Sequence, residues 1–519
     1  EVGSYLSGHA VLRIGLCRRL RNRRRAVSQA SSTRFQPPCR LKSQTIIIAL
    51  RAQEKDMPPT KIVVIGAGSA SFGLNTLAAL MGSRRLRESH LALVDRNPDA
   101  LALVGRLAHR LNREWDARMT VTTHTHHAEA LEGAEFVVLS IEVTPRERLW
   151  RTDYEIPLRY GVRQPYAENG GPGGFAHAAR NIGPVMEIVR DMEKLCPDAW
   201  LINYTNPMIR ICDAIARYSR IKVVGLCHQI YTGYAVVGLA LAADLGLTVP
   251  EGFTDTRASL ATIPAREVVI RQAVERLDIR VAGLNHFSWM LSVRDRHTGD
   301  DLYPLFAARW AQMNPAFEPL TRRMYEIFGL FPVSGDSHLS EYLPWVSDPV
   351  TRPWEKYHLE LYEWDVWEGV RDVRHEEMAR FADGRLSLDA LAEADSEGAL
   401  EMIENIAGAG RHYHLAVNVP NRGAISNLPE GAIVEVPGVV TGAGVQGVCV
   451  GALPEPIAEL CRREIAVARL CVDAAVNGDR RAALQCLLLD PVVTDIEVAR
   501  RILDDYLTTY REYLPQFWQ

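Results

Sequence analysis

Two short segments supply the residue types of a metal site. Cys227 and His228 end a strand-like run, VVGLCHQIY, and Asn285 and His286 occur in LNHFSW. A thiolate and an imidazole from separate segments can bind a divalent cation whose remaining ligands are substrate oxygens. A lone cysteine is more often buried and inert, and the spacing alone does not bring the two segments together. Both interpretations stay open at the level of residue types.

A polar segment further along, GDSHLSEYLPW, contains several groups that titrate or form hydrogen bonds: Asp336, His338, Glu341 and Tyr342. If this segment is helical, Asp336 and Glu341 do not lie on one face. At most one or two of these groups therefore belong to a single site. The alternative interpretation is a solvated polar turn.

A glycine-rich loop follows the first apolar run, in KIVVIGAGSASFG. Gly66 permits a tight turn, Gly68 lets the backbone approach a pyrophosphate, and the next helix offers its first amides to the anion. Ser71 replaces the third glycine of the usual dinucleotide-binding pattern. The alternative is a glycine turn without a ligand. If the loop does bind a pyrophosphate, a bulky side chain at Gly68 should block it and leave the fold intact.

Asp95 ends the second apolar run, 27 residues beyond Gly68. A carboxylate at this point accepts hydrogen bonds from the adenosine ribose, which favours NAD over NADP, although the neighbouring Arg96 weakens that preference. The predicted cofactor contacts are Gly66, Gly68, Ser69, Phe72, Asp95 and Asn203.

Two further segments hold candidate substrate contacts. The glycines of ENGGPGGF do not suit core packing and indicate a loop close to a ligand, or else a flexible surface loop. Asn203 and Asn206, in NYTNPM, end another predicted strand, at the edge where open α/β sheets bind ligands. Their amides either bind sugar or cofactor hydroxyls or cap the helix expected to begin at Pro207. The predicted substrate contacts are Asn206, Glu168 and Asn169.

The elements that must position these residues fit a parallel sheet. Helical patterns, such as 98–113 and 181–195, separate most of the apolar runs. Apolar strands that alternate with helices indicate a sheet covered on both faces. We therefore predict an α/β fold with a Rossmann-type, doubly wound parallel sheet, whose strands are 61–66, 91–95, 119–123, 136–140, 199–203 and 222–227.

The pattern becomes mixed after about residue 250. Strand-like pieces at 279–284 and 432–436 lie among longer helical patterns, notably 454–476. We predict an NAD-binding Rossmann domain over 57–250. A mixed α+β domain over 251–519 is expected to carry substrate, metal and oligomer contacts.

Residues 1–56 differ from the rest of the chain. They contain twelve Arg and Lys but three acids, a composition typical of a transit peptide or a nucleic-acid-binding segment. We favour a third interpretation, in which Met57, just before the first predicted strand, is the natural start. This basic extension is therefore expected to be disordered or non-native, and dispensable for folding and activity.

The whole chain has an ordinary globular composition, with 47% hydrophobic and 24% charged residues and a net charge of −4. Collagen-like and disordered classes are excluded. No apolar run reaches the roughly 18 residues that a membrane span needs. Nine cysteines without paired spacing predict a reduced, cytoplasmic protein rather than a disulfide framework.

Taken in order, these segments resemble glycoside hydrolase family 4, a group of NAD- and manganese-dependent glycosidases that includes α-glucosidases and α-galactosidases. The similarity runs from about Lys61 to about Leu514 and implies a lactate/malate dehydrogenase-like fold. The matching segments are IGAGSASF, LVDRN, DYEIPLRYG, GPGG, NPM, GLCH, the NH of GLNHFSW, HLSEYLPW and NVPNRGAISNLPEGAIVEVP. So many ordered matches are more specific than any single motif.

The resemblance implies an elimination mechanism instead of the usual pair of catalytic carboxylates. NAD removes hydride from C3 of the sugar, Mn²⁺ polarises the resulting ketone, and a base takes the C2 proton. The aglycone then leaves, water adds, and the hydride returns. By the same resemblance, Cys227 and His286 bind the metal and Asn206 holds substrate hydroxyls.

The resemblance also bears on the remaining catalytic residues. His228 stands where members that act on phosphorylated sugars carry an acid, which favours a non-phosphorylated glycoside. The base is assigned to Asp336, in the GDSH stretch before the EYLP motif, with Tyr342 as the alternative because the phospho-glycosidases usually employ a tyrosine. Gln229 matches no specificity group, so the sugar and its anomer stay open.

The implied protein is a homodimer or homotetramer that acts on a small glycoside and binds neither nucleic acid nor membrane. Two other classes share part of the pattern. An NAD-dependent 2-hydroxy acid dehydrogenase of the malate type would have the same fold and cofactor but would produce net NADH. A non-catalytic NAD-binding sensor would keep the glycine loop and need no metal.

Overall fold

Within residues 57–69, 73–164, 166–256 and 262–519, which the computed structural model describes, the strands form one twelve-stranded sheet. The first six strands are parallel and lie in the order β3-β2-β1-β4-β5-β6, which is the order of a dinucleotide-binding sheet. The predicted Rossmann-type fold is therefore confirmed. These strands are β1 (Lys61–Ile65), β2 (His90–Val94), β3 (Thr120–His124), β4 (Phe136–Leu139), β5 (Trp200–Asn203) and β6 (Lys222–Gly225).

The sheet continues into an antiparallel part, in the order β6-β10-β11-β7-β8-β9, with β12 paired to β11. Asn418 of β10 pairs with Gly225, and Glu435 of β11 pairs with Gly283 of β7. The described residues form one compact unit, and the proposed division near residue 250 falls between its parallel and antiparallel strands. The later strands are β7 (Leu277–Leu284), β8 (Phe287–Asp295), β9 (Phe331–Pro332), β10 (Arg411–Pro420), β11 (Ile433–Thr441) and β12 (Gly444–Gly447).

Helices separate the parallel strands as the sequence predicts. The predicted helix at 98–113 is present, whereas that at 181–195 begins earlier, at Gly171. In the first half the helices are α2 (Gly73–Gly82), α3 (Pro98–Glu114), α4 (Ala128–Leu131), α5 (Arg146–Leu158), α6 (Gly171–Leu195), α7 (Met208–Tyr218), α8 (Ile230–Ala240) and α9 (Ala242–Leu245). In the second half they are α10 (Ile263–Arg276), α11 (Tyr303–Gln312), α12 (Pro319–Phe328), α13 (Gly335–Leu339), α14 (Pro353–Lys356), α15 (Trp364–Ala382), α16 (Ala399–Ala407), α17 (Glu455–Asn477), α18 (Arg480–Leu489) and α19 (Ile496–Thr509).

Helix α3 shows why these elements begin where they do. The side-chain oxygen of Asn97 accepts the backbone N–H groups of Asp99 and Ala100 at 3.0 and 3.2 Å, and Pro98 occupies the first helical position. Its buried residues, among them Leu107 and Leu111, form the apolar face. The cap fixes the start of α3 immediately after the loop that carries Asp95.

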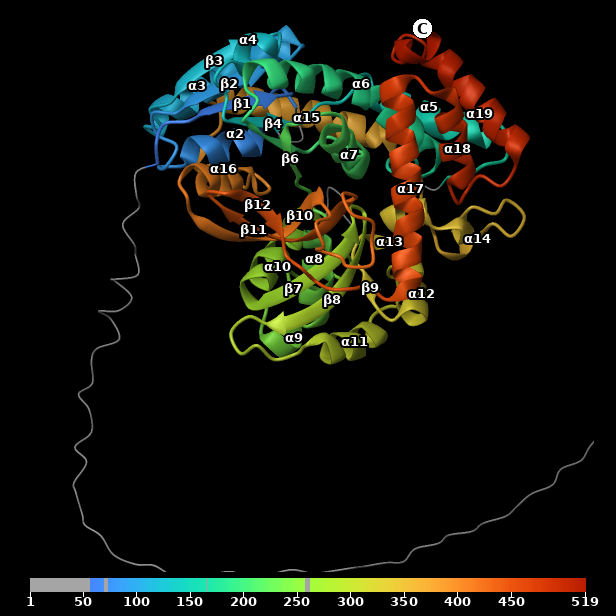
Figure 1. Ribbon diagram of the computed structural model, residues 1–519. Helices are drawn as coiled ribbons and strands as arrows, with labels where there is room; N and C mark the ends of the chain where they lie inside the picture. Colours follow the sequence, from blue (N-terminus) through green and yellow to red (C-terminus); the bar gives the residue numbers. More distant parts are fainter. Residues whose placement is uncertain (1–56, 70–72, 165, 257–261) are drawn as a thin grey trace, which may run out of the picture. The chain divides into compact units, whose positions relative to one another are not determined.

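Helix α17 contacts both the parallel and the antiparallel parts of the fold. It packs on α6 and α7 and also contacts β7, and Figure 1 shows it running from the parallel layer to the antiparallel strands. No helix in the described ranges is long and apolar enough to cross a membrane. The seven cysteines in those ranges are all free thiols.

Candidate active site

A cavity of about 2640 Å³ opens at the carboxyl edge of the parallel strands. That volume exceeds the roughly 300–1,000 Å³ of a site for one small ligand, so the cavity has room for a dinucleotide and a sugar together. Most of the residues singled out from the sequence line it: Gly66, Gly68, Ser69, Asp95, Glu168, Asn206, Cys227, His228, His286 and Asp336. Phe72 lies outside the described residues.

The glycine loop connects β1 to α2 at one end of this cavity. Gly66 has a φ of +86°, and a Cβ on it would lie 1.9 Å from the carbonyl oxygen of Ser140, so only glycine fits. At Gly68 a Cβ would lie 2.6 Å from Cβ of Ala100 and 2.8 Å from Oδ2 of Asp95. The expectation that a bulky residue at Gly68 leaves the fold intact is therefore wrong, because Gly68 also packs directly on α3.

Gly68→Ala is expected to weaken NAD binding by about tenfold, because the loop must shift to relieve an overlap that costs roughly 1–3 kcal/mol. Calorimetric titration with NAD and a thermal unfolding curve would measure the two effects together. Gly82→Ala, at the exposed end of α2, is the matched control, since its Cβ would meet only ordinary contacts at 3.6 Å. NAD affinity equal to that of the parent in Gly68→Ala would place the dinucleotide elsewhere.

Asp95 organises the same loop. Its Oδ2 accepts the N–H of Gly68 and its Oδ1 accepts the N–H of Asn97, both at 2.8 Å. Each oxygen keeps a second lone pair that a ribose hydroxyl can donate to. Asn203 is fully buried, and its amide donates to the carbonyl of Thr205 at 3.0 Å. Asn203 would therefore affect a bound cofactor only indirectly, by holding the conformation of the turn that follows β5.

The two metal-ligand candidates lie together. Cys227 follows β6, His286 lies between β7 and β8, and the Cys227 Sγ and His286 Nε2 atoms are 3.5 Å apart. Burial raises the pKa of Cys227 to about 12, and burial lowers the pKa of His286 well below its ordinary value. A bound cation would need the thiolate, so binding must release a proton from Cys227.

A tight hairpin turn directs the His286 side chain toward Cys227. Asn285 and His286 form the two-residue loop between β7 and β8, and His286 adopts a φ of +63°. That conformation is uncommon for a residue with a side chain and clusters at functional sites. Gln229 accepts the His286 N–H at 2.7 Å, and the Asn285 amide donates to Glu435 at 2.7 Å.

Two further donors lie beside His286. Possible ligand atoms of Glu168, His286 and His338 lie within 4.8 Å of one another, and the His286 and His338 rings stack at 4.1 Å. Burial alone would lower the pKa of His338, but its hydrogen bond to Glu341 and the nearby charge of Glu168 raise it overall. The residues around His286 can therefore supply more than the two ligands expected from the sequence.

Glu341 holds the glycine-rich segment against this site. One carboxylate oxygen of Glu341 accepts the N–H groups of Glu168, Asn169 and Gly170 at 2.8, 2.6 and 3.1 Å. The following glycines are buried in the first turns of α6, where a Cβ on Gly173 would lie 2.8 Å from Cβ of Ala167. The expectation that these glycines do not serve packing is therefore wrong.

Glu168 and Asn206 present polar atoms to the cavity. Glu168 accepts from Arg146 at 3.1 Å and from the Asn169 amide at 3.0 Å. Asn169 thus orients Glu168. The Oδ1 atom of Asn206 is buried and lacks a hydrogen-bond partner among the described residues. The side chain does not cap α7, so of the two interpretations the geometry favours ligand binding by Asn206.

The side chains of Asp336 and Tyr342 lie in different environments. Asp336 lines the cavity, and its carboxylate accepts the N–H groups of Leu320 and Thr321 at the start of α12, at 2.9 and 2.6 Å. Tyr342 is fully buried, does not line the cavity formed by the described residues, and donates to the Asn285 carbonyl at 3.4 Å. Asp336 is therefore the more accessible of the two candidate bases.

Sequence reasoning missed several partners of these residues. Glu397 lies 3.3 Å from His228, and its charge and hydrogen bond raise the pKa of His228 above the ordinary value. The one sequence signal for Glu435 is an acid inside the apolar run IVEVP; Glu435 is fully buried and accepts from the Asn285 amide of the hairpin. Glu142 also lines the cavity, and although burial would raise its pKa, the charge and hydrogen bond of His177 lower it to about 2.

Comparisons with known proteins agree with this arrangement. The model of the family 4 glycosyl hydrolases matches residues 61–241, and that of their C-terminal domain matches residues 281–493. An α-glucosidase of Erwinia rhapontici is 31% identical over 88% of this chain and 99% of the relative. An α-galactosidase of Bacillus subtilis is 28% identical over the same shares of the two chains.

Solved structures share the fold. The Bacillus subtilis protein LplD superposes with a TM-score of 0.74 at 26% identity, over 86% of this chain and all of that one. A 6-phospho-α-glucosidase from gut microorganisms has a TM-score of 0.68 at 22% identity, over 88% and 99% of the two chains. The family models together span more than half of the chain. The chain therefore belongs to family 4 of the glycosyl hydrolases and is a glycoside hydrolase.

Proposed function

We propose that this enzyme hydrolyses the O-glycosidic bond of a non-phosphorylated glycoside, with NAD and Mn²⁺ as bound cofactors. The observation that carries the proposal is the approach of Cys227 to His286, at 3.5 Å, in the cavity that Gly66, Gly68 and Asp95 also line. A plain dehydrogenase or an NAD sensor does not account for family membership. The α-glucosidase and α-galactosidase relatives favour a non-phosphorylated sugar.

The residues present fit both cofactors. Gly66 and Gly68 add no side chain to the start of the β1–α2 turn, and Asp95 can accept from a ribose hydroxyl. Cys227 and His286 can hold a divalent cation, while the unpaired Asn206 oxygen is available for a substrate hydroxyl. The 6-phospho-α-glucosidase of the same fold was crystallised with NAD and Mn²⁺. When bound, the two groups supply a hydride acceptor and a Lewis acid.

The chain's own side chains then have separate tasks. Glu168 and Asn206 bind sugar hydroxyls, with Glu168 held in place by Arg146 and Asn169. Asp336 removes the proton from C2 of the sugar, with the second lone pairs of its oxygens still available beyond the α12 contacts. His228, paired with Glu397, faces the same cavity and contacts the substrate.

Assays against both anomers of p-nitrophenyl glucosides and galactosides, and their 6-phospho forms, test this function. With NAD⁺, Mn²⁺ and a thiol reductant, we expect release of nitrophenol from a non-phosphorylated substrate and no net NADH. Net accumulation of NADH would favour a dehydrogenase. Cleavage of only the 6-phospho substrates would overturn the proposed sugar class.

We also propose a cytoplasmic homodimer or homotetramer. Family membership leads us to this expectation, and the exposed side chains of Ile327, Trp345 and Val350, by 58%, 50% and 87%, are candidates for burial in such a contact. Light scattering after gel filtration should give a mass of two or four chains. A monomer at micromolar concentration would contradict this assembly.

A further inference from the structure

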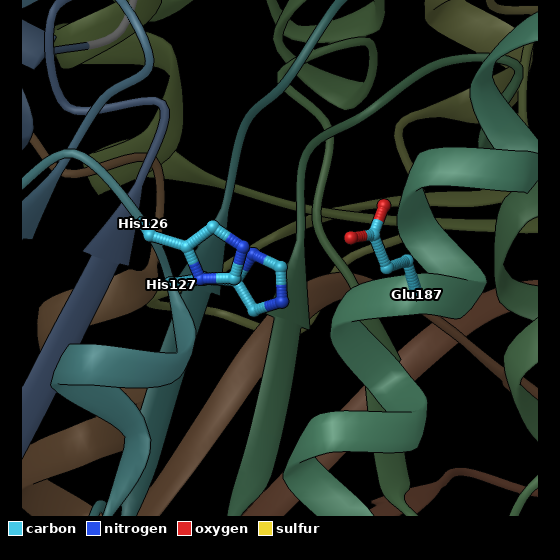
Figure 2. A group of neighbouring side chains, drawn as sticks. All are labelled: His126, His127 and Glu187. Atoms are coloured by element: carbon cyan, nitrogen blue, oxygen red, sulfur yellow. The ribbon is translucent and has the colours of Figure 1, made fainter.

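A second group of metal-ligating side chains lies in the same cavity, away from Cys227 and His286. His126 and His127 follow β3, and Glu187 comes from α6. One ligand atom from each lies within 4.8 Å of the others. Figure 2 shows the Glu187 carboxylate directed toward the two imidazole rings. None of the steps proposed for the glycosidase employs these three residues.

The His127 ring is already held as metal-binding imidazoles usually are. His127 is buried, and its Nε2 donates to Oδ2 of Asp191 at 3.0 Å. Oδ1 of Asp191 in turn accepts from Lys194 at 3.0 Å. A carboxylate on one ring nitrogen fixes the tautomer and leaves the lone pair on the other nitrogen, here Nδ1. His127 is therefore a preoriented ligand.

The other two side chains can move to complete the site. His126 is exposed, its Nδ1 accepts the N–H of Ala128 at 3.2 Å, and its ring stacks on that of His127 at 4.5 Å, so Nε2 is the atom that faces an ion. Glu187 pairs with Arg96 at 3.7 Å, with the two side chains 53% and 73% exposed, and such surface pairs exchange readily. Ligands of a four-coordinate zinc ion lie about 3.3 Å apart, so rotation of these two side chains closes the site.

We propose that His126, His127 and Glu187 form a second cation site, completed by water, that takes a zinc-like ion. Two imidazoles and one carboxylate suit Zn²⁺, and the order of affinities among divalent metals places Mn²⁺ far below it. Arg96, the partner of Glu187, directly follows Asp95. The three residues and Asp95 line the same cavity, and on the proposed function the presence of the ion weakens dinucleotide binding.

The ion site is tested first by metal binding alone. A full-length Cys227→Ser/His286→Ala variant removes the first metal pair, and titration with Zn²⁺ or Co²⁺, followed by calorimetry and cobalt absorption, should still show a bound ion. Adding Asp191→Asn should lower its affinity by about 10–100-fold, and His127→Ala by at least as much. His109→Ala, an exposed histidine on α3, is the matched control and should leave the affinity unchanged.

If His127→Ala unfolds, Glu187→Gln still tests the site. Glu187 is exposed, and the glutamine side chain has the same shape as the glutamate that it replaces. We expect this variant to melt like its parent and to bind zinc at least tenfold more weakly, since the amide is neutral. Zinc or cobalt binding with the same stoichiometry and affinity in both His127→Ala and Glu187→Gln would overturn the site.

A second titration tests the consequence for the dinucleotide. NAD affinity should fall when zinc saturates the Cys227→Ser/His286→Ala protein, and should not fall in the same protein with Glu187→Gln. Unchanged NAD affinity in the first case would overturn the competition. Failure to bind NAD even without zinc would instead count against the proposed function, while the zinc titration would still decide whether the ion site exists.

Discussion

Removing either Cys227 or His286 is expected to abolish metal-dependent turnover. Thiolate is a soft ligand and manganese prefers oxygen donors, so the pair should bind Mn²⁺ weakly and need substrate oxygens to complete the site. Losing either of these two ligands leaves too little affinity at micromolar metal, even with Glu168 and His338 beside the site. Cys227→Ser and His286→Ala should cost little stability, because Cys227 is half-buried and Nδ1 of His286 has no hydrogen-bond partner among the described residues.

Electron paramagnetic resonance of free Mn²⁺ measures the lost binding directly, apart from activity. In the parent enzyme, a chelator should remove activity and added Mn²⁺ should restore it, while oxidation of the thiol should inactivate the enzyme. Cys449→Ser and His297→Ala, at exposed positions away from the cavity, are controls that should behave like the parent. Full activity in Cys227→Ser, in His286→Ala or in excess EDTA would remove the metal from the mechanism.

Asp336→Asn is expected to lower kcat by about 10²–10⁴-fold, the usual contribution of a general base. The asparagine keeps one oxygen to accept from the start of α12, so the fold should survive with a modest loss of stability. Tyr342→Phe, which removes a single long hydrogen bond of 3.4 Å outside the cavity, should retain most of the activity. Thermal unfolding of both variants separates a loss of chemistry from a loss of fold.

Substrate deuterated at C2 distinguishes the two candidate bases. If proton removal limits the rate in the parent, Asp336→Asn should show an isotope effect at least as large as that of the parent, together with its low kcat. Near-normal turnover in Asp336→Asn, combined with a collapse in Tyr342→Phe, would move the role to the tyrosine.

The parallel half of the fold could be predicted because each of its strands is recognisable from its own local sequence. Most are short apolar runs bounded by polar or glycine residues, and the six observed strands agree with the predicted ones to within one or two residues. The start of α6 was missed because Gly173 and Gly174 are poor helix formers. Close packing against Ala167 and Asn169 overrides that propensity.

The approach of Cys227 to His286 could not be predicted from physical principles alone. It depends on β10 and β11, which enter the sheet between β6 and β7 although they come much later in the chain. Glu397 and Glu435 were missed for a related reason. Each acquires its role from a partner distant in sequence, His228 and Asn285 respectively, and no local spacing records such a contact.

The insertion of β10 and β11 between β6 and β7 also sets an order of events during synthesis. Cys227 and His286 are translated well before the strands that space them, which end at Thr441. At about 5–20 residues per second, the delay between His286 and Thr441 is roughly 8–30 s. Until then the emerging chain holds two unpaired ligands, which have little affinity for an ion. If Cys227 and His286 bind the metal as proposed, the order of translation delays metal capture until β11, which ends at Thr441, has been made.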